Sequence, residues 1–199
     1  MLRLHPRRSE WERQMAGPFS PNATHPQSTI LNQQSFHPAA LPQEQLLAQC
    51  EVERLRRSGP GGQHRNKVET AVRLTHHPSG ITAMASERRS QSDNFRNALF
   101  RLRVQLALSL RTTRELKPST LWKERCIGGR ILINPKHDDF PTLLADALDL
   151  LASTEWNVPD AAQLLACTSS QLLKFLRHDP RALELVNERR MDQDLNRLK

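Results

Sequence analysis

A glycine-rich stretch near the middle of the chain, Gly59-Pro-Gly-Gly-Gln63, has the residue types best suited to chemistry. Three glycines and a proline within a few positions prevent a regular helix or strand, so the stretch must be a loop. Gly61 and Gly62 can adopt positive φ and let the main chain pass close to another molecule where a Cβ would clash. The Gln63 amide is neutral and can orient a water molecule without taking its proton. Such a loop offers close approach and hydrogen bonding rather than a nucleophilic side chain.

Positive charge is concentrated around this loop. The whole chain has 29 Lys and Arg against 21 Asp and Glu, for a net charge of +8 and a pI near 10.2. Residues 50–117 have 14 basic and six acidic residues, whereas residues 1–49 amount to +1 and residues 118–199 to −1. This distribution predicts a polyanionic partner, nucleic acid or an anionic membrane surface, bound by the central segment.

The remaining composition excludes several classes of protein. Cys50, Cys126 and Cys167 are far apart and odd in number, which argues against a disulfide framework or a zinc site and fits a reducing compartment. No apolar run approaches the roughly 20 residues that cross a bilayer, so we expect a soluble protein without a membrane partner. Glu10 and Glu12 argue against a transit peptide, so the cytoplasm is predicted rather than the mitochondrial matrix.

The elements around the loop predict a small α+β domain with one basic surface. In chain order they are a strand over 50–57, the glycine loop, a short helix over 66–70, a hairpin with strands at 72–76 and 81–85, and a long helix that begins after Ser90 or Ser92. The long helix has a single apolar stripe at Phe95, Leu99, Leu102, Leu106 and Leu110.

Four blocks in this segment resemble, in order and spacing, the catalytic domain of class I peptide chain release factors. They are Ser58-Gly-Pro-Gly-Gly-Gln-His-Arg-Asn-Lys67, Ala71-Val-Arg-Leu-Thr-His76, Pro78-Ser-Gly-Ile81 and Glu87-Arg-Arg-Ser-Gln91. The resemblance covers roughly residues 50–110 and implies a catalytic domain over 50–117. A flexible glycine loop without a chemical role is the alternative, and the extended set of blocks argues against it.

The resemblance implies hydrolysis of the ester between a nascent peptide and the 3′-terminal adenosine of a tRNA. Gly61, Gly62 and Gln63 would then be the catalytic residues, with Gln63 in the peptidyl-transferase centre of the large-subunit rRNA, beside the P-site peptidyl-tRNA. No cofactor and no metal is implied. The predicted RNA-binding residues are Arg57, Ser58, His64, Arg65, Asn66, Lys67, Arg96, Arg101 and Arg103.

Codon reading is not expected of this chain. Only 58 residues precede Gly59, and residues 1–49 are Pro-rich and predicted to be a disordered tail. The Ser-Gly-Pro-Gly-Gly-Gln string is similar to that of the short ribosome-rescue hydrolases, which act without a codon. The chain departs from many of these because its end, Met191-Asp-Gln-Asp-Leu-Asn-Arg-Leu-Lys199, is nearly neutral rather than basic.

Residues 118–199 predict an all-helical module. Helices are expected at 140–151, 161–166, 172–176 and after Asp179, and Thr168 with Gln171 has the spacing of a capping box. Residues 160–176 are similar to a helix-turn-helix unit, so the alternative function is a non-catalytic protein that binds nucleic acid through this segment. A compact bundle, with contacts to an unknown protein or to rRNA, is favoured because the second helix offers few cations.

Overall fold

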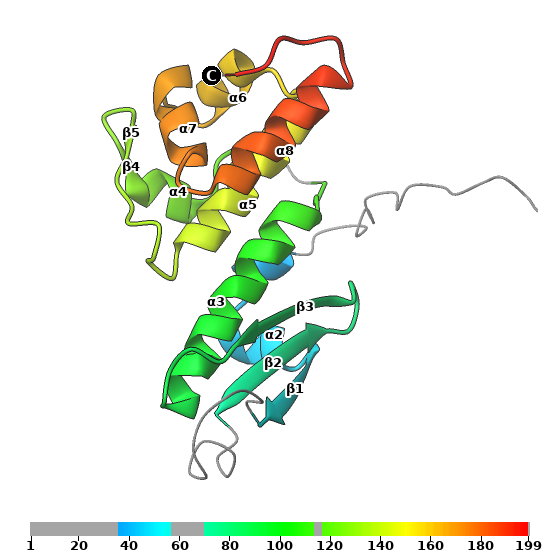
Figure 1. Ribbon diagram of the computed structural model, residues 1–199. Coiled ribbons are helices and arrows are strands. Elements are labelled where there is room, and N and C mark those ends of the chain that lie inside the picture. The colour runs from blue at the N-terminus through cyan, green and yellow to red at the C-terminus, as the bar shows by residue number, and fades with distance from the viewer. Residues whose placement is uncertain (1–35, 57–69, 114–116, 199) are drawn as a thin grey trace, which may run out of the picture.

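The computed structural model of the chain describes residues 36–56, 70–113 and 117–198. Its two parts share one long helix, α3 (Gln91–Ser109), which runs from the sheet at one end of the molecule to the helices at the other (Figure 1). The predicted fold class, α+β, is confirmed. Within the described residues no helix combines the length and the apolar character that a membrane span needs.

The sheet has three antiparallel strands in the order β1 (Cys50–Leu55), β2 (Ala71–His76) and β3 (Ile81–Ala85). The expected strands and the hairpin between β2 and β3 are confirmed. Gly80 has φ +69°, which a residue with a Cβ adopts only with strain, and it closes the hairpin turn. Leu74 and Ala83 are register partners on the face covered by α3, and both are buried.

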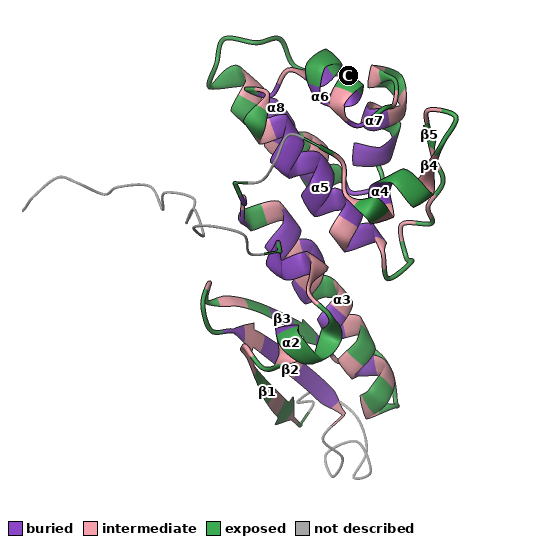
Figure 2. Cartoon of the chain, turned by 180° about the vertical axis from the view of Figure 1, so that it is seen from behind, coloured by how far each residue is buried: buried purple, intermediate pink, exposed green. Residues whose placement is uncertain are grey.

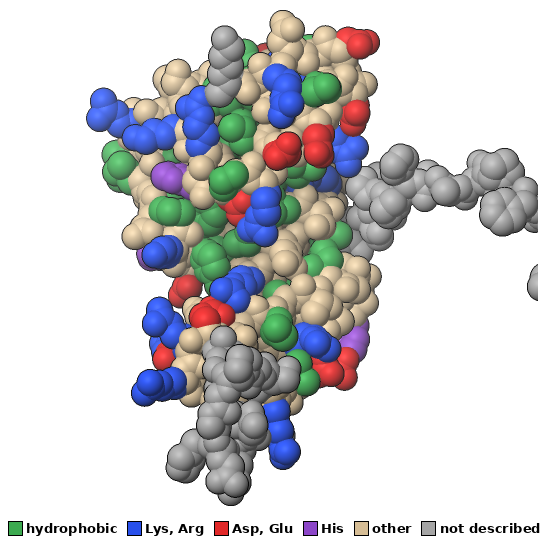
Figure 3. Space-filling model, viewed as in Figure 1, with side chains coloured by type: hydrophobic (Ala, Val, Ile, Leu, Met, Phe, Trp, Pro, Cys, Tyr) green, Lys and Arg blue, Asp and Glu red, His purple; other side chains and the backbone are tan. Residues whose placement is uncertain are grey.

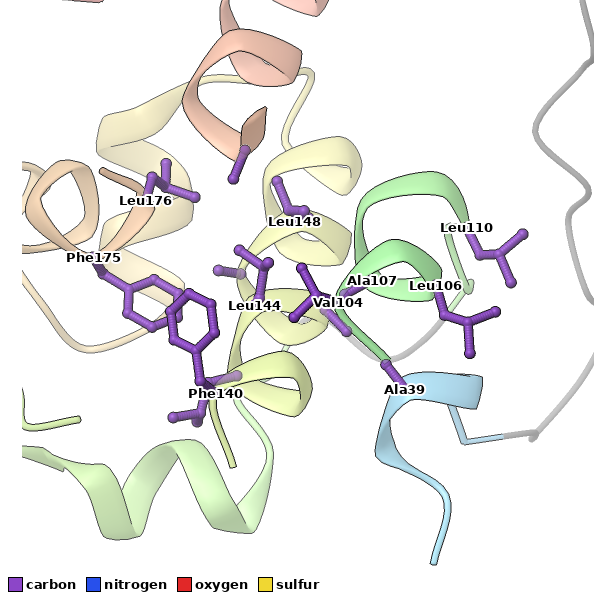
Figure 4. Packing of buried hydrophobic residues seen from close by; sticks show 14 of the residues in the cluster. Ala39, Val104, Leu106, Ala107, Leu110, Phe140, Leu144, Leu148, Phe175 and Leu176 are labelled. Atoms are coloured by element: carbon purple, nitrogen blue, oxygen red, sulfur yellow. The ribbon is translucent and has the colours of Figure 1, made fainter. Parts of the chain in front are cut away.

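Helix α3 is buried on two sides. Ser90 caps it, its hydroxyl accepting from the Asp93 N–H, so the first of the two predicted caps is correct. The predicted stripe packs on the sheet and on the N-terminal segment. A second set, Val104 and Ala107, points instead toward α5 (Phe140–Ser153), where Figure 4 shows these side chains beside Leu144 and Leu148. One continuous hydrophobic core therefore joins the sheet to the C-terminal helices.

The N-terminal segment was predicted to be disordered through residue 49, and this is wrong for residues 36–49. Two short helices, η1 (Pro38–Ala40) and α2 (Gln43–Leu47), pack on the core, and Ala39 and Leu46 are fully buried. The Arg103 guanidinium on α3 donates to the carbonyls of Ala39 and Leu41, both at 2.6 Å. These partners are more than 60 positions away in the chain, so no local pattern could indicate them.

The four predicted C-terminal helices are present as α5, α6 (Val158–Leu164), α7 (Ser169–Leu176) and α8 (Pro180–Met191). However, α6 and α7 each begin three residues before the predicted ranges of 161–166 and 172–176. Thr168 accepts from the Gln171 N–H at 3.2 Å, as the capping-box spacing indicated. Helix α5 is buried along most of its length (Figure 2), because α3 packs against it on one side and the other helices on the other. It is the central element of this module.

Two elements of the module were not predicted, namely α4 (Thr120–Arg125) and a hairpin of two-residue strands, β4 (Cys126–Ile127) and β5 (Arg130–Ile131). The module is therefore not all-helical. Strands this short show no alternation in the sequence. The turn between them is Gly128-Gly129, with φ of +57° and +74°.

Candidate functional site

Both ends of the glycine loop are fixed at the same end of the sheet, where β1 stops and β2 starts. Leu55 ends β1 and Ala71 begins β2, and the two are register partners. The chain therefore leaves and re-enters the sheet at neighbouring positions, beside the N-terminal end of α3 (Figure 1). The predicted catalytic residues Gly61, Gly62 and Gln63 belong to this connection and lie outside the described residues. So do the predicted RNA-binding residues Arg57, Ser58, His64, Arg65, Asn66 and Lys67, as well as most of the short helix expected over 66–70.

Asn94 holds the returning end of the loop against α3. Its side chain is fully buried, and its amide nitrogen donates to the Thr70 carbonyl at 2.6 Å and to the Arg88 carbonyl at 2.9 Å. Its amide oxygen accepts from the Arg88 N–H at 2.9 Å. One side chain thus ties the residue after the loop to the connection that precedes α3. Asn94 was not among the predicted site residues, although a polar residue one turn into an otherwise apolar helix face is a signal for it in the sequence.

The connection between β3 and α3 brings cations to this end of the molecule. Arg88 and Arg89 are exposed and form no ion pair with any other residue in the described part of the chain. Because Asn94 fixes the backbone of Arg88, these side chains project from a held position beside Thr70. Both arginines belong to Glu87–Gln91, one of the four blocks that resemble release factors, and no role was predicted for them.

Glu87, in the same connection, is already engaged. Its carboxylate accepts from Arg101 at 2.7 and 3.2 Å and from Asn97 at 3.1 Å. Slight burial would raise the pKa of Glu87, but backbone N–H donors and the Arg101 guanidinium together hold it below its ordinary value. Glu87 is therefore ionised at neutral pH and directs Arg101 back toward β3.

The three described arginines of the predicted interface differ in what they contact. Arg96 is the most exposed, and it pairs with Asp93 one turn earlier on α3. Arg101 is half exposed and also donates to the Met84 carbonyl at 2.8 Å. Arg103 is partly buried. Burial lowers the pKa of its guanidinium, and the negative charge of Asp138 acts in the opposite direction. RNA binding by all three stays a prediction, and Arg103 has in addition a structural contact with the N-terminal segment.

A second polar cluster lies at the opposite end of α3. Arg111 is 3.6 Å from the buried Asp149 carboxylate, which also accepts from the backbone and hydroxyl of Thr112. Burial lowers the pKa of Arg111 to about 10, although Asp149 opposes this effect. These groups satisfy one another where α3 meets α5. Among the residues that the structure describes, no three His, Cys, Asp or Glu side chains come together as metal ligands.

Comparison of the sequence with known proteins finds similar proteins for this segment. Residues 46–127 match the family model of the RF-1 domain. The mitochondrial peptide chain release factor 1 of Kluyveromyces lactis is 43% identical over 74 residues, which are 37% of this chain and 19% of that protein. Peptide chain release factor 1 of Delftia acidovorans is 42% identical over 76 residues, 38% of this chain and 21% of that protein. The matched part of the chain thus spans about a fifth of the length of either relative, and the predicted resemblance is confirmed.

Proposed function

Because residues 46–127 are an RF-1 domain, we propose that this protein hydrolyses the ester of peptidyl-tRNA on the ribosome. The observation that supports this most directly is the placement of the loop ends. Leu55 and Ala71 face each other at the sheet edge, and Asn94 fixes the adjacent Thr70. Fixed ends determine where the loop leaves and re-enters the sheet, which supports a positioned backbone donor of the kind that such catalysis requires.

The proposed chemistry uses water as the nucleophile. Attack of water on the ester carbonyl gives a tetrahedral intermediate with a negatively charged oxygen. Its collapse breaks the bond to the ribose 3′-oxygen, which leaves with a proton, while the peptide leaves as a carboxylic acid. The Gln63 N–H is assigned to stabilise the charge that develops on these oxygens, and the Gln63 side chain to orient the water. Gly61 and Gly62 would allow the close approach.

The proposed partners are the rRNA of the peptidyl-transferase centre and the P-site peptidyl-tRNA. The positive charge of residues 50–117 supports this choice, since phosphates dominate the affinity of such contacts. Arg88 and Arg89 join the predicted set because they are exposed beside the anchored end of the loop. The three cysteines fit a reducing compartment, and we keep the cytoplasm as the proposed location.

We propose further that release is independent of the codon, as in ribosome rescue. Ahead of the loop, the described residues 36–49 pack against α3 and α5 and present no separate reading surface. Reading three bases demands several hydrogen-bond donors and acceptors held on a rigid surface. The Ala- and Leu-rich faces of α5 and α7 are instead buried against their neighbours.

Peptide release from matched ribosomal complexes tests both the proposed hydrolysis and its proposed independence of the codon. The complexes differ only in the A site, which holds a stop codon, a sense codon or no mRNA. We expect equal release rates in the three. A tenfold preference for a stop codon, about 1.4 kcal/mol of discrimination, would contradict codon independence while leaving hydrolysis in place.

Gly62→Ala is the matched catalytic control. Its Cβ should block close approach and lower the release rate about 100-fold or more while leaving ribosome binding unchanged. Gln63→Ala keeps the backbone N–H and should retain partial activity. A protein that only binds nucleic acid, the alternative function, would bind ribosomes and release no peptide in any complex.

A further inference from the structure

Helices α6 and α7 form a helix-turn-helix unit with a fixed turn. The Cys167 N–H donates to the Ala162 carbonyl and the Ala166 N–H to the Gln163 carbonyl, both at 3.0 Å, while Ala166 has φ +51°. This bond pattern closes a helix end and sets the direction of the next helix. The α4 helix also stabilises the turn, because the Trp122 indole donates to the Leu165 carbonyl at 2.8 Å.

Helix α4 and the hairpin β4–β5 pack directly beside this unit. Trp122 of α4 meets Phe175 of α7 edge to face, with ring centroids 5.5 Å apart. The Cys126 thiol lies 3.6 Å from the Ala166 carbonyl, and β5 contacts α7. The two opposite views of the molecule both place α4, the hairpin and α7 together (Figures 1 and 2). They make one continuous surface at the end of the module.

Each of the three elements α4, β5 and α7 has an exposed cation. Lys123 of α4, Arg130 of β5 and Lys174 of α7 are exposed, and none of them forms an ion pair or side-chain hydrogen bond within the described part of the chain. We call these three residues the distal basic face. Figure 3 shows Lys and Arg side chains over the hairpin and α7, and acidic side chains toward the far end of α8.

The arginines on the α8 side, by contrast, form ion pairs or hydrogen bonds. Arg181 pairs with Asp179 at 2.6 Å, Arg189 with Asp192 at 3.7 Å, and Arg190 donates to the Trp156 carbonyl at 2.7 Å. The net charge of the module is close to zero, but its two sides differ in how far their cations are paired. The three cations of the distal basic face form no ion pair within the described part of the chain, and uncompensated positive charge of this kind attracts a polyanion.

We propose that the distal basic face is a second RNA-binding surface, which contacts the phosphate backbone of ribosomal RNA away from the catalytic loop. The proposal rests on the proposed function, which places the loop in the ribosome. Helix α3 has 19 residues and a length of about 28 Å, and its packing on α5 fixes the module at the end opposite the loop. The RNA contacted would therefore lie roughly 30 Å or more from Leu55 and Ala71, between which the loop runs.

The chemistry of the face favours phosphate over base contacts. Its cations are spread over α4, β5 and α7 instead of following one helix, and the deep, narrow major groove of A-form RNA does not admit a helix. Contacts of this kind carry little sequence information and weaken as salt displaces them. Binding by the distal basic face should accordingly depend on salt and tolerate changes of RNA sequence.

The test removes the three charges together in the full-length chain. In Lys123→Gln/Arg130→Gln/Lys174→Gln we expect about tenfold weaker ribosome binding at moderate salt and a shallower salt dependence. The release rate at saturating protein should stay that of the parent, because the loop is untouched. The matched control, Arg181→Gln/Arg189→Gln/Arg197→Gln, removes the same charge from the α8 side and should bind as the parent does. Circular dichroism confirms that both variants fold.

Equal affinity of the triple variant and the control for ribosomes would overturn the inference. So would tighter binding of a 20-base-pair DNA duplex than of the RNA duplex of the same sequence by the parent chain. Binding and release are measured separately. A parent chain that binds ribosomes but releases no peptide would refute the proposed function, while the ribosome affinities would still decide on the distal basic face.

Discussion

At the scale of single residues, the arrangement at the loop depends on one amide side chain. The fully buried side chain of Asn94 makes three hydrogen bonds to the backbone of Thr70 and Arg88. Each such bond contributes about 0.5–1.5 kcal/mol, so the three together make this position sensitive to change. Its role is to position the loop, since it lies on α3 and does not belong to the loop itself.

We expect Asn94→Ala to lower the free energy of unfolding by about 2–4 kcal/mol, because it removes three hydrogen bonds made by a fully buried side chain. Urea denaturation measures this. Asn97→Ala is the matched control, since Asn97 lies on the same helix and makes one exposed bond to Glu87. It should change stability by no more than about 0.5 kcal/mol. Similar losses in the two variants would mean that the contacts of Asn94 are not what holds this end of the sheet.

At the scale of elements, the connection from β3 to α3 and the N-terminal segment each have a distinct task. The connection presents Arg88 and Arg89 beside the loop. The N-terminal segment closes the seam between sheet and module, where His37 accepts from the Ala39 N–H at 3.0 Å through Nδ1. Its Nε2 then has the proton and donates to the Leu110 carbonyl at 3.2 Å.

Arg88→Gln/Arg89→Gln should weaken ribosome binding and reduce the slope of log K against log salt by about 1 for each arginine that contacts a phosphate. The reason is that each neutralised phosphate releases counterions. Binding titrations between about 50 and 200 mM salt give the slope. Arg189→Gln/Arg197→Gln loses the same charge on the α8 side and serves as the control. An unchanged slope in the first variant would place the phosphate contacts elsewhere.

Acid should loosen the N-terminal segment. Burial lowers the pKa of His37 from its ordinary 6.5, although Asp149 opposes this and Arg111 adds to it. The unfolded chain therefore takes up a proton near pH 6.5 that the folded chain resists, and stability is lost as the pH falls below that value. Burial also lowers the pKa of His76, which contributes in the same direction.

The free energy of unfolding should thus fall between pH 7 and 5, by at most about 1.4 kcal/mol per pH unit for each such histidine. In His37→Gln the fall should be shallower, with the part due to His76 remaining. A parent whose stability rises on acidification would contradict the sign of the effect.

At the scale of the whole molecule, the sheet and the C-terminal module share one core. Val104 and Ala107 of α3 meet Leu144 and Leu148 of α5 in the middle of that core (Figure 4). Burial of large side chains across such a contact supplies much of the stability of each part, so neither part should keep its packing alone. The module is therefore held in one orientation relative to the loop.

A single cooperative unfolding transition is the expected consequence. Trp122 and Trp156 are buried in the module, so their fluorescence reports on it, whereas far-ultraviolet circular dichroism reports on both parts. The two signals should share one midpoint in urea. Leu144→Ala should lower both midpoints together, with a loss of about 2–5 kcal/mol. Two separated transitions would show that the parts fold independently.

Elements with local signals could be predicted from the amino-acid pattern alone. Ser90 and Thr168 cap helices through bonds to residues three positions later, and the β2–β3 hairpin follows from a four-residue turn. Apolar periodicity likewise placed α3 and α5. The blocks around Gln63 indicated the release-factor domain, which the family comparison supports. In each case the determining contacts are close in the chain, or the residue types themselves are distinctive.

Features that depend on partners distant in the chain could be seen only in the folded molecule. Asn94 meets Thr70 across 24 positions, and Arg103 meets Ala39 across 64. Residues 36–49 look too polar and Pro-rich to fold alone, yet they are ordered because α3 and α5 offer them a buried surface and satisfied carbonyls. The hairpin β4–β5 likewise depends on its contact with α7. Burial and hydrogen bonding between distant segments supply the free energy that stabilises these features. A local sequence pattern cannot indicate such contacts.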